Sequence, residues 1–567
     1  MFADSVYALP RARTVPARGF VVDGDVIAGA ALLSVALCIG LATASDYGLT
    51  IDEFNTNDYG PKALAWYTSG FKDRSHFETV EQFLWYYGPW AQILTAIVQS
   101  LNLASPLTIR HAVNFSIGLA GLAALIPIAR LTVGRWAGPV AIALCLMTGY
   151  FYGSLFFTPI DIPFLAAMTW AVLAILLMAR RGVPSWPATV AAGVLTGFAM
   201  GTRTGGIITH AYLLMAMTLC GLEIALRQGR AALKPLAQIG LRTLCTVAIA
   251  WITAIVIWPW LQVGNPFSQF RIAFVHFATI PMSFEFLHWG ETLTTNALPW
   301  YYIPQQFLVR LPEGFLILLV VGLVIGVASA VMFSLATIAR LREQGVSGLK
   351  TPALVLARAR GPLVLIAAAA VPIGFLIVQK STLYDGVRHI MFVIPMLAVL
   401  AAGALLRIIP LLRRFPVLAA VAASVALAHV GVTVATLVGL HPLQYVAMNS
   451  LVGGVKGAKG RFELDYWAAG ATEALRQLER RLDNDKSGRF TSSPPRVFVC
   501  MTYREGVAGQ LFRRNWVVAA EIDKADFIIE TERWRCAENS TATLIDEVKR
   551  FDASFAWIYA NNRGRGL

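Results

Sequence analysis

Residues 26–44 read VIAGAALLSVALCIGLATA, a continuous run of apolar and small residues. A helix needs about 20 such residues to cross the hydrocarbon core of a bilayer, so this run predicts a membrane span. The chain continues as Thr50-Ile-Asp-Glu-Phe-Asn-Thr-Asn-Asp-Tyr-Gly60, which brings Asp52, Glu53 and Asp58 close to that span. Carboxylates beside a membrane are costly unless they face water, a cation or a reacting group. The stretch is therefore a candidate site, with a solvated loop as the alternative.

The composition of the whole chain is that of a membrane protein. Of its 567 residues, 57% are hydrophobic and only 14% are charged, whereas soluble domains carry roughly 25% charged residues. The net charge of +14 would suit a nucleic-acid partner, but Lys and Arg that collect in cytoplasmic loops produce the same excess. The positions of the basic residues decide between these two explanations.

Apolar runs predict a polytopic α-helical protein with about 11 transmembrane helices. The predicted spans are at about 26–44, 109–130, 137–157, 160–179, 187–202, 207–222, 239–258, 312–337, 361–379, 389–407 and 416–439. The segment 86–103 is also apolar, but it is short and begins with aromatic residues. These properties favour a helix that lies in the membrane interface.

The basic residues support this topology. Clusters at 130–135, 180–181, 227–242, 340–360 and 407–414 all fall on the side of the N-terminus, which itself carries Arg11, Arg13 and Arg18. Short cytoplasmic loops are enriched in Lys and Arg. We therefore expect a multi-pass protein of the inner (plasma) membrane, with a cytoplasmic N-terminus, an extracytoplasmic C-terminus and no nucleic-acid partner. A cleaved signal peptide is the alternative for the first run, but it would release the acidic stretch from the membrane.

The predicted topology divides the chain into three parts. These are a cytoplasmic tail at 1–24, a transmembrane domain at 25–440 with external loops at about 46–108 and 259–310, and an extracytoplasmic domain at 441–567. In the last part, strand-like runs at 496–500, 527–530 and 555–559 and helical patterns at 468–483 and 542–551 predict a small α/β domain. Cys500 and Cys536 lie in this polar region, and only in an oxidising compartment would they form a disulfide.

The topology also leaves a few cations outside, among them Arg203, Lys380 and Arg388, with His389 next to the last. Arginine offers planar bidentate hydrogen bonding to the oxygens of a lipid phosphate or a pyrophosphate. The alternative for each of them is an interfacial side chain that reaches lipid headgroups. Lys380 and Arg388 flank Tyr384-Asp385-Gly386 in one short loop and are the best candidates as a group. The sequence has no metal motif of convincing spacing and no Gly-rich phosphate loop.

Several motifs occur in a characteristic order. They are the Asp52-Glu53 pair, the interfacial Gly88-Pro89-Trp90, Ile109-Arg110-His111, Phe157-Thr-Pro-Ile-Asp161 and the run from Ala192 to Arg203. In this order they resemble the bacterial membrane glycosyltransferases of the GT-C superfamily, of the protein mannosyltransferase-like and aminoarabinose transferase-like type (glycosyltransferase family 39-like). The stretches 382–389 and 441–467 are similar to the same group, which extends the resemblance along the chain.

The resemblance implies an enzyme that moves a hexosyl or pentosyl group at the external membrane face. The donor would be a polyprenyl-phosphate sugar and the acceptor a lipid, a glycan or a protein. Asp52 would be the general base, Glu53 an orienting group, and Asp161 a group that positions the acceptor, the sugar or a metal. A divalent metal ion stays open, because some relatives use one and others do not.

In the same resemblance, Arg203, Lys380, Arg388 and His389 would bind the donor phosphate and neutralise its charge. The competing function is a membrane transporter or lipid flippase in which Asp52 and Asp161 couple transport to an ion. The acidic residues stand at the ends of spans, and no repeat of paired broken helices is visible, which argues against a transporter.

Overall fold

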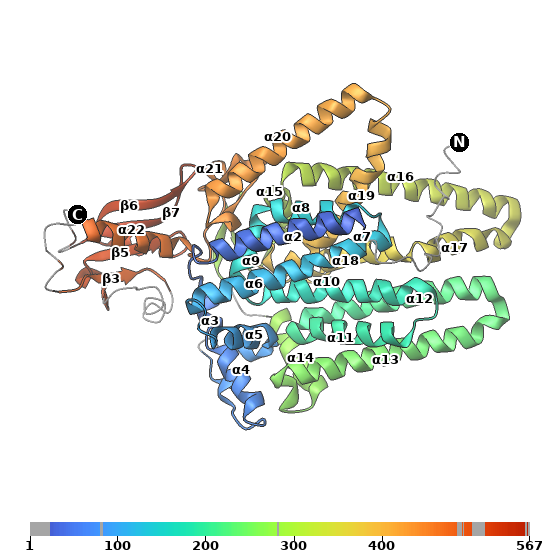
Figure 1. Ribbon diagram of the computed structural model, residues 1–567, viewed down its shortest axis with the longest axis horizontal. Helices are drawn as coiled ribbons and strands as arrows, with labels where there is room; N and C mark the ends of the chain where they lie inside the picture. The colour runs from blue at the N-terminus through green and yellow to red at the C-terminus, as the bar shows by residue number, and fades with distance from the viewer. Residues whose placement is uncertain are drawn as a thin grey trace.

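The computed structural model describes residues 23–79, 83–279, 283–484, 490, 493–501, 516–561 and 564. The predicted basic tail, with Arg11, Arg13 and Arg18, lies outside the described residues. Two parts are visible in Figure 1: a long bundle of helices, and a small sheet with one helix at one end of that bundle.

Except for α17, the helices of the bundle correspond to the predicted spans. They are α2 (Gly24–Thr43), α6 (Pro106–Ala123), α7 (Leu125–Thr132), α8 (Ala137–Met147), α9 (Gly149–Phe157), α10 (Asp161–Met178), α11 (Trp186–Thr202), α12 (Ile208–Gln228), α13 (Leu233–Ile257), α16 (Glu313–Gln344), α17 (Lys350–Arg358), α18 (Arg360–Val378), α19 (Ile394–Leu412) and α20 (Pro416–Leu440). Each of the eleven predicted runs falls on one of these helices or on a consecutive pair. The prediction of a polytopic helical membrane protein is confirmed.

By length and composition, eight helical stretches of the described chain can cross a membrane, or nine if the bent pair α8 and α9 forms one span. The axes of that pair differ by 76°. One of the eight stretches, Thr204–Ile257, contains both α12 and α13. The side chains of α10 are almost all buried, whereas in α20 only Leu440 is buried, although α20 is as apolar as α10. A membrane supplies the apolar surroundings that α20 requires.

Local sequence signals mark the beginnings of several helices. The Ser105 hydroxyl accepts a hydrogen bond from the Thr108 amide (3.2 Å), and Pro106 takes the first position of α6. Asn265 caps α14 (Pro266–Ala278) in the same way, by accepting hydrogen bonds from two amides. Both combinations satisfy amides that would otherwise lack partners at a helix start.

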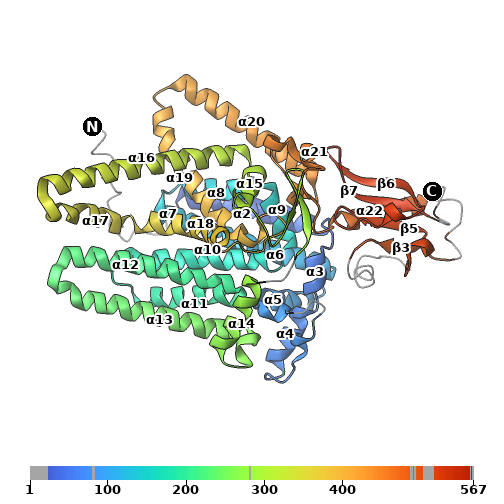
Figure 2. The same ribbon diagram turned by 180° about the vertical axis from the view of Figure 1, so that it is seen from behind.

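The loops at the sheet end of the bundle are largely helical. The first loop contains α3 (Ile51–Thr56), α4 (Tyr59–Thr68) and α5 (Trp90–Gln99), and the last of these is the predicted interfacial helix, with ten residues. The second loop contains α14, the hairpin of β1 (Glu285–His288) and β2 (Glu291–Thr294), and α15 (Tyr302–Arg310). Figure 2 shows from behind that α3, α4, α5 and α14 all lie at this end.

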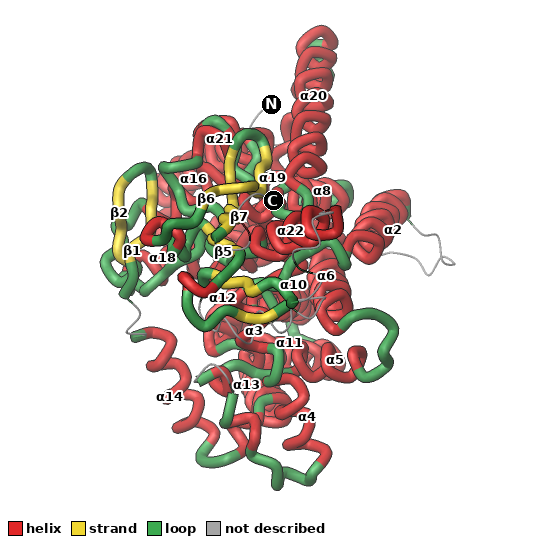
Figure 3. The backbone as a smooth tube through the Cα atoms, turned by 90° about the vertical axis from the view of Figure 1, so that its left-hand side faces the viewer, coloured by secondary structure: helices red, strands yellow, loops and turns green. Residues whose placement is uncertain are grey.

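The C-terminal region forms a five-stranded sheet in the order β4-β3-β5-β7-β6. Its strands are β3 (Arg496–Val499), β4 (Val517–Val518), β5 (Phe527–Thr531), β6 (Thr543–Arg550) and β7 (Ala553–Ala560). The pairs β3/β4 and β3/β5 are parallel, and β5/β7 and β6/β7 are antiparallel. Helix α22 (Gly470–Asn484) packs against the sheet. In Figure 3, which looks along the bundle from this end, the sheet and α22 lie in front of the helices.

Two expectations for this region have clear outcomes. Cys500 and Cys536 form a disulfide, with their Cα atoms 5.8 Å apart. The predicted helix at 542–551 is wrong, because this segment is the strand β6. Phe551 and Asp552 adopt left-handed backbone angles that turn the chain, and β6 then pairs with β7 along its length. Pairing with a strongly strand-forming neighbour outweighs a weak local helical pattern.

Candidate functional site

Helix α3 owes its position to Thr50 and Glu53. The Thr50 hydroxyl accepts a hydrogen bond from the Glu53 amide, and Glu53 Oε2 accepts one from the Thr50 amide (3.1 Å). This reciprocal arrangement is a capping box. The other oxygen of Glu53 lies 2.9 Å from His111 Nε2, and both side chains are fully buried. Glu53 therefore fixes the helix that carries Asp52.

Asp52 meets Arg388, which stands 336 positions later in the sequence. Arg388 Nη1 donates to Asp52 Oδ2 at 2.5 Å, and the same nitrogen lies 3.1 Å from Asp385 Oδ2. Arg388 Nε lies 4.0 Å from Asp161 Oδ2. One guanidinium group is thus shared among three carboxylates.

Asp161 is the first residue of α10, a position where the helix dipole favours a negative charge. Arg203 follows the end of α11 and donates from Nη1 to Asp161 Oδ1 at 2.6 Å. A small cavity lies between these side chains. Its lining residues are Asp52, Tyr87, Thr158, Pro159, Ile160, Asp161, Arg203 and Arg388.

The Gly88-Pro89-Trp90 motif holds Tyr87 at this cavity. The Gly88 amide donates to the Thr202 carbonyl (3.1 Å), and a Cβ on Gly88 would collide with the carbonyl oxygen of Gly201. Only glycine permits this close approach of two backbones. The contact ties the start of α5 to the end of α11, directly before Arg203.

Burial raises the pKa of the Asp52 carboxyl above its ordinary value; Arg388 opposes this shift, and the charges of Asp385 and Asp161 add to it. Loss of hydration disfavours a carboxylate, as do neighbouring negative charges. Burial also raises the pKa of the Tyr87 and Tyr384 phenols, so both remain neutral hydrogen-bonding groups at physiological pH.

The remaining predicted site residues are placed differently. The Lys380 side chain is exposed, and in the described ranges no carboxylate lies within ion-pair distance of it. His389 follows Arg388 and packs edge-on against the Tyr384 ring at 4.7 Å, outside the cavity lining. The structure thus brings Asp52, Asp161, Arg203 and Arg388 together, but not Lys380.

Two participants were absent from the predicted set: Asp385, which binds Arg388, and Tyr87. The sequence does contain a signal for Asp385, because it stands in the Tyr384-Asp385-Gly386 stretch between the predicted cations Lys380 and Arg388. Within the described chain, no group of three or more His, Cys, Asp or Glu side chains is arranged to hold a metal ion. The positive charge beside the three aspartates comes from Arg388, Arg203 and Arg533.

No protein-family model and no curated protein matches the chain. Among solved structures, it is similar to ArnT from Cupriavidus metallidurans bound to undecaprenyl phosphate, with 17% identity and a TM-score of 0.43 over 94% of this chain and 98% of that chain. It is also similar to the oligosaccharyltransferase of Archaeoglobus fulgidus in complex with zinc and sulfate, with 14% identity and a TM-score of 0.39 over 88% of this chain and 68% of that chain. The first is an aminoarabinose transferase, the type named from the sequence motifs.

Proposed function

We propose that the chain is a membrane glycosyltransferase that moves a sugar from a polyprenyl-phosphate donor to a lipid, glycan or protein acceptor. Asp52 acts as the general base. One observation carries the proposal. Asp52 Oδ2 is held by Arg388, its Oδ1 has no hydrogen-bond partner in the described part of the chain, and the cavity that Asp52 lines is also lined by Asp161 and Arg203. A base with a free oxygen thus faces cations suited to a phosphate.

The chemistry follows from this arrangement. An acceptor hydroxyl oxygen attacks the anomeric carbon of the sugar, while the bond from that carbon to the phosphate oxygen breaks. The electron pair leaves with the polyprenyl phosphate, and the hydroxyl proton passes to Asp52. A single displacement of this kind inverts the anomeric configuration. Because a phosphate is a good leaving group, the cations Arg203 and Arg388 need only neutralise its charge.

Arg388 also connects donor binding to the base. A carboxylate in a 2.5 Å contact with a guanidinium group is a weak base, because the neighbouring positive charge favours its ionised form. A donor phosphate attracts the same guanidinium group. Movement of Arg388 toward the phosphate would free Asp52 to accept a proton when both substrates are present.

Two features support a reaction on the external side of the membrane. The disulfide Cys500–Cys536 belongs to the sheet at the end of the bundle where α3 lies, and disulfides persist in oxidising compartments. The connection from α12 to α13, with its basic residues, lies at the opposite end, as cytoplasmic loops require. The N-terminus is then cytoplasmic and the C-terminal domain extracytoplasmic, as proposed from the sequence.

The positions of the acids fit a transferase better than a transporter. Asp161 is the first residue of its helix, and Asp52 lies on the six-residue α3 between two spans. Ion-coupling carboxylates of transporters lie near the middle of the membrane instead.

A genetic experiment tests the proposed function. Membrane lipids and surface glycans of cells lacking the gene are compared by mass spectrometry with those of cells complemented by the wild type, Asp52→Asn or Asp58→Asn. Asp58 is a matched control, because it pairs with Lys62 (2.7 Å) outside the cavity. We expect the wild type and Asp58→Asn to restore a sugar modification that Asp52→Asn does not restore. Restoration by Asp52→Asn would remove the general-base assignment.

A further inference from the structure

A buried ion pair joins the C-terminal sheet to the loop before α19. Arg533 follows β5 by two residues, and its Nη2 donates to Asp385 Oδ1 at 2.6 Å. The same side chain donates from Nε and Nη2 to the two oxygens of Glu463, both at 2.6 Å. The side chain of Asp385 is only 3% exposed and that of Arg533 19%. Bidentate pairs of this kind fix the geometry of both partners.

Asp385 uses its second oxygen to contact the catalytic cluster. Asp385 Oδ2 lies 3.1 Å from Arg388 Nη1, and that nitrogen is also the one that donates to Asp52. A continuous line of alternating charges therefore runs from Arg533 through Asp385 and Arg388 to Asp52. The first and second members are 148 positions apart in the sequence.

The backbone around Arg533 is itself held in place. The preceding residue, Glu532, accepts hydrogen bonds from the amides of Leu464 (3.1 Å) and Asp465 (2.9 Å). Asp465 is buried and in turn accepts from the amides of Ala469 and Gly470. The segment that contains these residues also contacts α3, because the Trp467 carbonyl accepts from the Ile51 amide (3.4 Å). Arg533 thus projects from a fixed base toward the site.

Arg533 supplies positive charge to a cluster in which carboxylates outnumber guanidinium groups. Four carboxylates (Asp52, Asp161, Asp385 and Glu463) contact three guanidinium groups (Arg203, Arg388 and Arg533). Without Arg533, Asp385 would have Arg388 as its remaining cation among these groups and would compete with Asp52 for it. The negative charge of Asp385 would then act on Asp52 with less compensation.

We propose that Arg533 is a positioning residue of the active site: it holds Asp385 and thereby sets where Arg388 and Asp52 lie. The C-terminal sheet is then part of the catalytic apparatus rather than an attached module. This inference rests on the proposed function, since it assigns Arg533 a role in the same transfer reaction.

The experiment compares Arg533→Gln, Arg533→Lys and Arg535→Gln. Arg535 is a matched control two residues further on, with an exposed side chain that pairs with Glu538. Purified full-length variants receive synthetic polyprenyl-phosphate hexoses and pentoses together with extracted membrane lipids and glycans as acceptors. Release of polyprenyl phosphate is measured from pH 4 to pH 9, and thermal unfolding and size-exclusion profiles show whether each variant is folded.

The pH dependence of the rate separates a positioning role from a merely structural one. The charged and titratable groups that face Asp52 are Arg388, Asp385, Tyr384, Asp161, Arg203 and Tyr87. Loss of Arg533 leaves the negative charge of Asp385 less compensated, so protonation of Asp52 occurs at a higher pH. We expect Arg533→Gln to lower kcat by about 10- to 100-fold, as does loss of other groups that orient an acting residue. We also expect the acidic limb of its profile to move to higher pH, Arg533→Lys to be intermediate, and Arg535→Gln to match the wild type.

A double variant protects the test against simple misfolding. Asp385→Asn combined with Arg533→Gln removes the uncompensated charge, so its acidic limb should return to lower pH than that of Arg533→Gln alone. An acidic limb and kcat of Arg533→Gln equal to those of the wild type would overturn the inference. The inference would also be overturned if the acidic limb stayed unchanged while Arg533→Gln and Arg533→Lys lost rate equally. Absence of transfer by the wild type would overturn the proposed function and the inference with it.

Discussion

The two ends of the helical bundle each carry a cluster of aspartates and arginines, and the clusters differ in how they use their charges. At the end away from the sheet, Asp25 lies in the first turn of α2 and is fully buried. Arg130 donates to both of its oxygens, at 2.7 and 2.6 Å, and Arg135 donates to one of them at 3.1 Å. Asp23 pairs with the same two arginines. Two acids meet two cations, and both oxygens of Asp25 are occupied.

At the other end, Arg388 is shared by Asp52, Asp161 and Asp385. Asp52 remains 28% exposed and lines a cavity, and its pKa is raised mainly by burial. An Asp–Arg pair alone therefore does not make a site. A free carboxylate oxygen, an excess of acids and an adjoining cavity distinguish a candidate catalytic group from a structural ion pair.

Replacing one aspartate by asparagine at each end of the bundle tests this distinction, and we expect it to give the largest change in activity. Asp52→Asn should lower the rate of sugar transfer by about 10²- to 10⁴-fold, the usual contribution of a general base, with little change in thermal stability. Asp25→Asn should cost about 1.5–3 kcal/mol of stability, because it weakens the charged hydrogen bonds that the buried Asp25 carboxylate accepts from Arg130 and Arg135, while activity per folded molecule is retained. Transfer assays and thermal unfolding measure the two outcomes. Activity loss in Asp25→Asn without loss of stability would erase the distinction.

The second prediction separates cations inside the cluster from those outside it. Arg203→Gln should raise the KM for the polyprenyl-phosphate donor by about 10- to 100-fold, since a hydrogen bond to a charged group contributes about 1.5–3 kcal/mol. Lys380→Gln should change it by less than about twofold, because exposed charges contribute little. Steady-state kinetics at varied donor concentration measure the KM of each variant. Equal effects of the two substitutions on this KM would mean that Lys380 also binds the donor phosphate.

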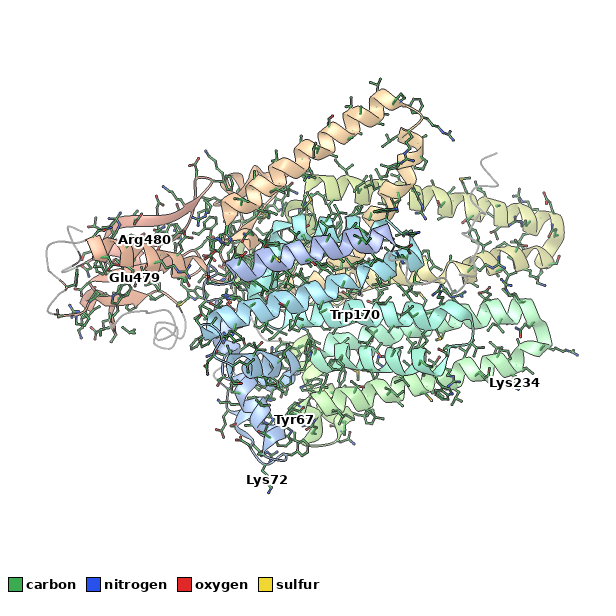
Figure 4. All side chains as sticks on the ribbon, viewed as in Figure 1. Tyr67, Lys72, Trp170, Lys234, Glu479 and Arg480 are labelled. Carbon is green, nitrogen blue, oxygen red and sulfur yellow. A yellow bond between two sulfur atoms is a disulfide. The ribbon has the colours of Figure 1, made fainter. Side chains whose placement is uncertain are left out.

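The third prediction concerns which end of the bundle faces outward. It involves no change in activity. Lys72 and Lys234 are exposed, and Figure 4 shows Lys72 toward the sheet end of the helical bundle and Lys234 at its opposite end. In intact cells, a membrane-impermeant maleimide should label a cysteine at position 72 and leave one at position 234 unlabelled until the membrane is opened. The reverse pattern would place the site in the cytoplasm.

Much of this arrangement was predictable from the sequence because it depends on local properties. The eleven apolar runs mark their own helices, since hydropathy over a span is a sum over neighbouring residues. Counting spans then places Asp52, Asp161, Arg203 and Arg388 at one end, which the structure confirms by direct contacts. Whether the number of preceding spans is odd or even tells at which end of the bundle a residue lies, but not how close it lies to other residues. For this reason the sequence groups Lys380 with Arg388, although the Lys380 side chain is exposed and does not line the cavity.

The contacts that complete the site depend on long-range packing. The link between Asp385 and Arg533 joins a membrane loop to a strand of the C-terminal sheet, and no local pattern encodes it. The partner of Glu53 is His111, which reaches it only because α6 packs beside α3. Strand β6 likewise exists because β7 lies beside it. In each case the tertiary neighbour, rather than the adjacent sequence, determines the outcome.

The pH dependence of sugar transfer by the purified wild-type protein tests the central claim most directly. Asp52 must be ionised to accept a proton, so activity should be present above its pKa and be lost as the pH falls through it. Because burial raises that pKa, the acidic limb should lie above the ordinary aspartate value of about 3.9. Asp385→Asn removes a negative charge near Asp52 and should move this limb to lower pH. A rate that stays level down to about pH 4, or a limb that persists unchanged in Asp52→Asn, would contradict Asp52 as the general base.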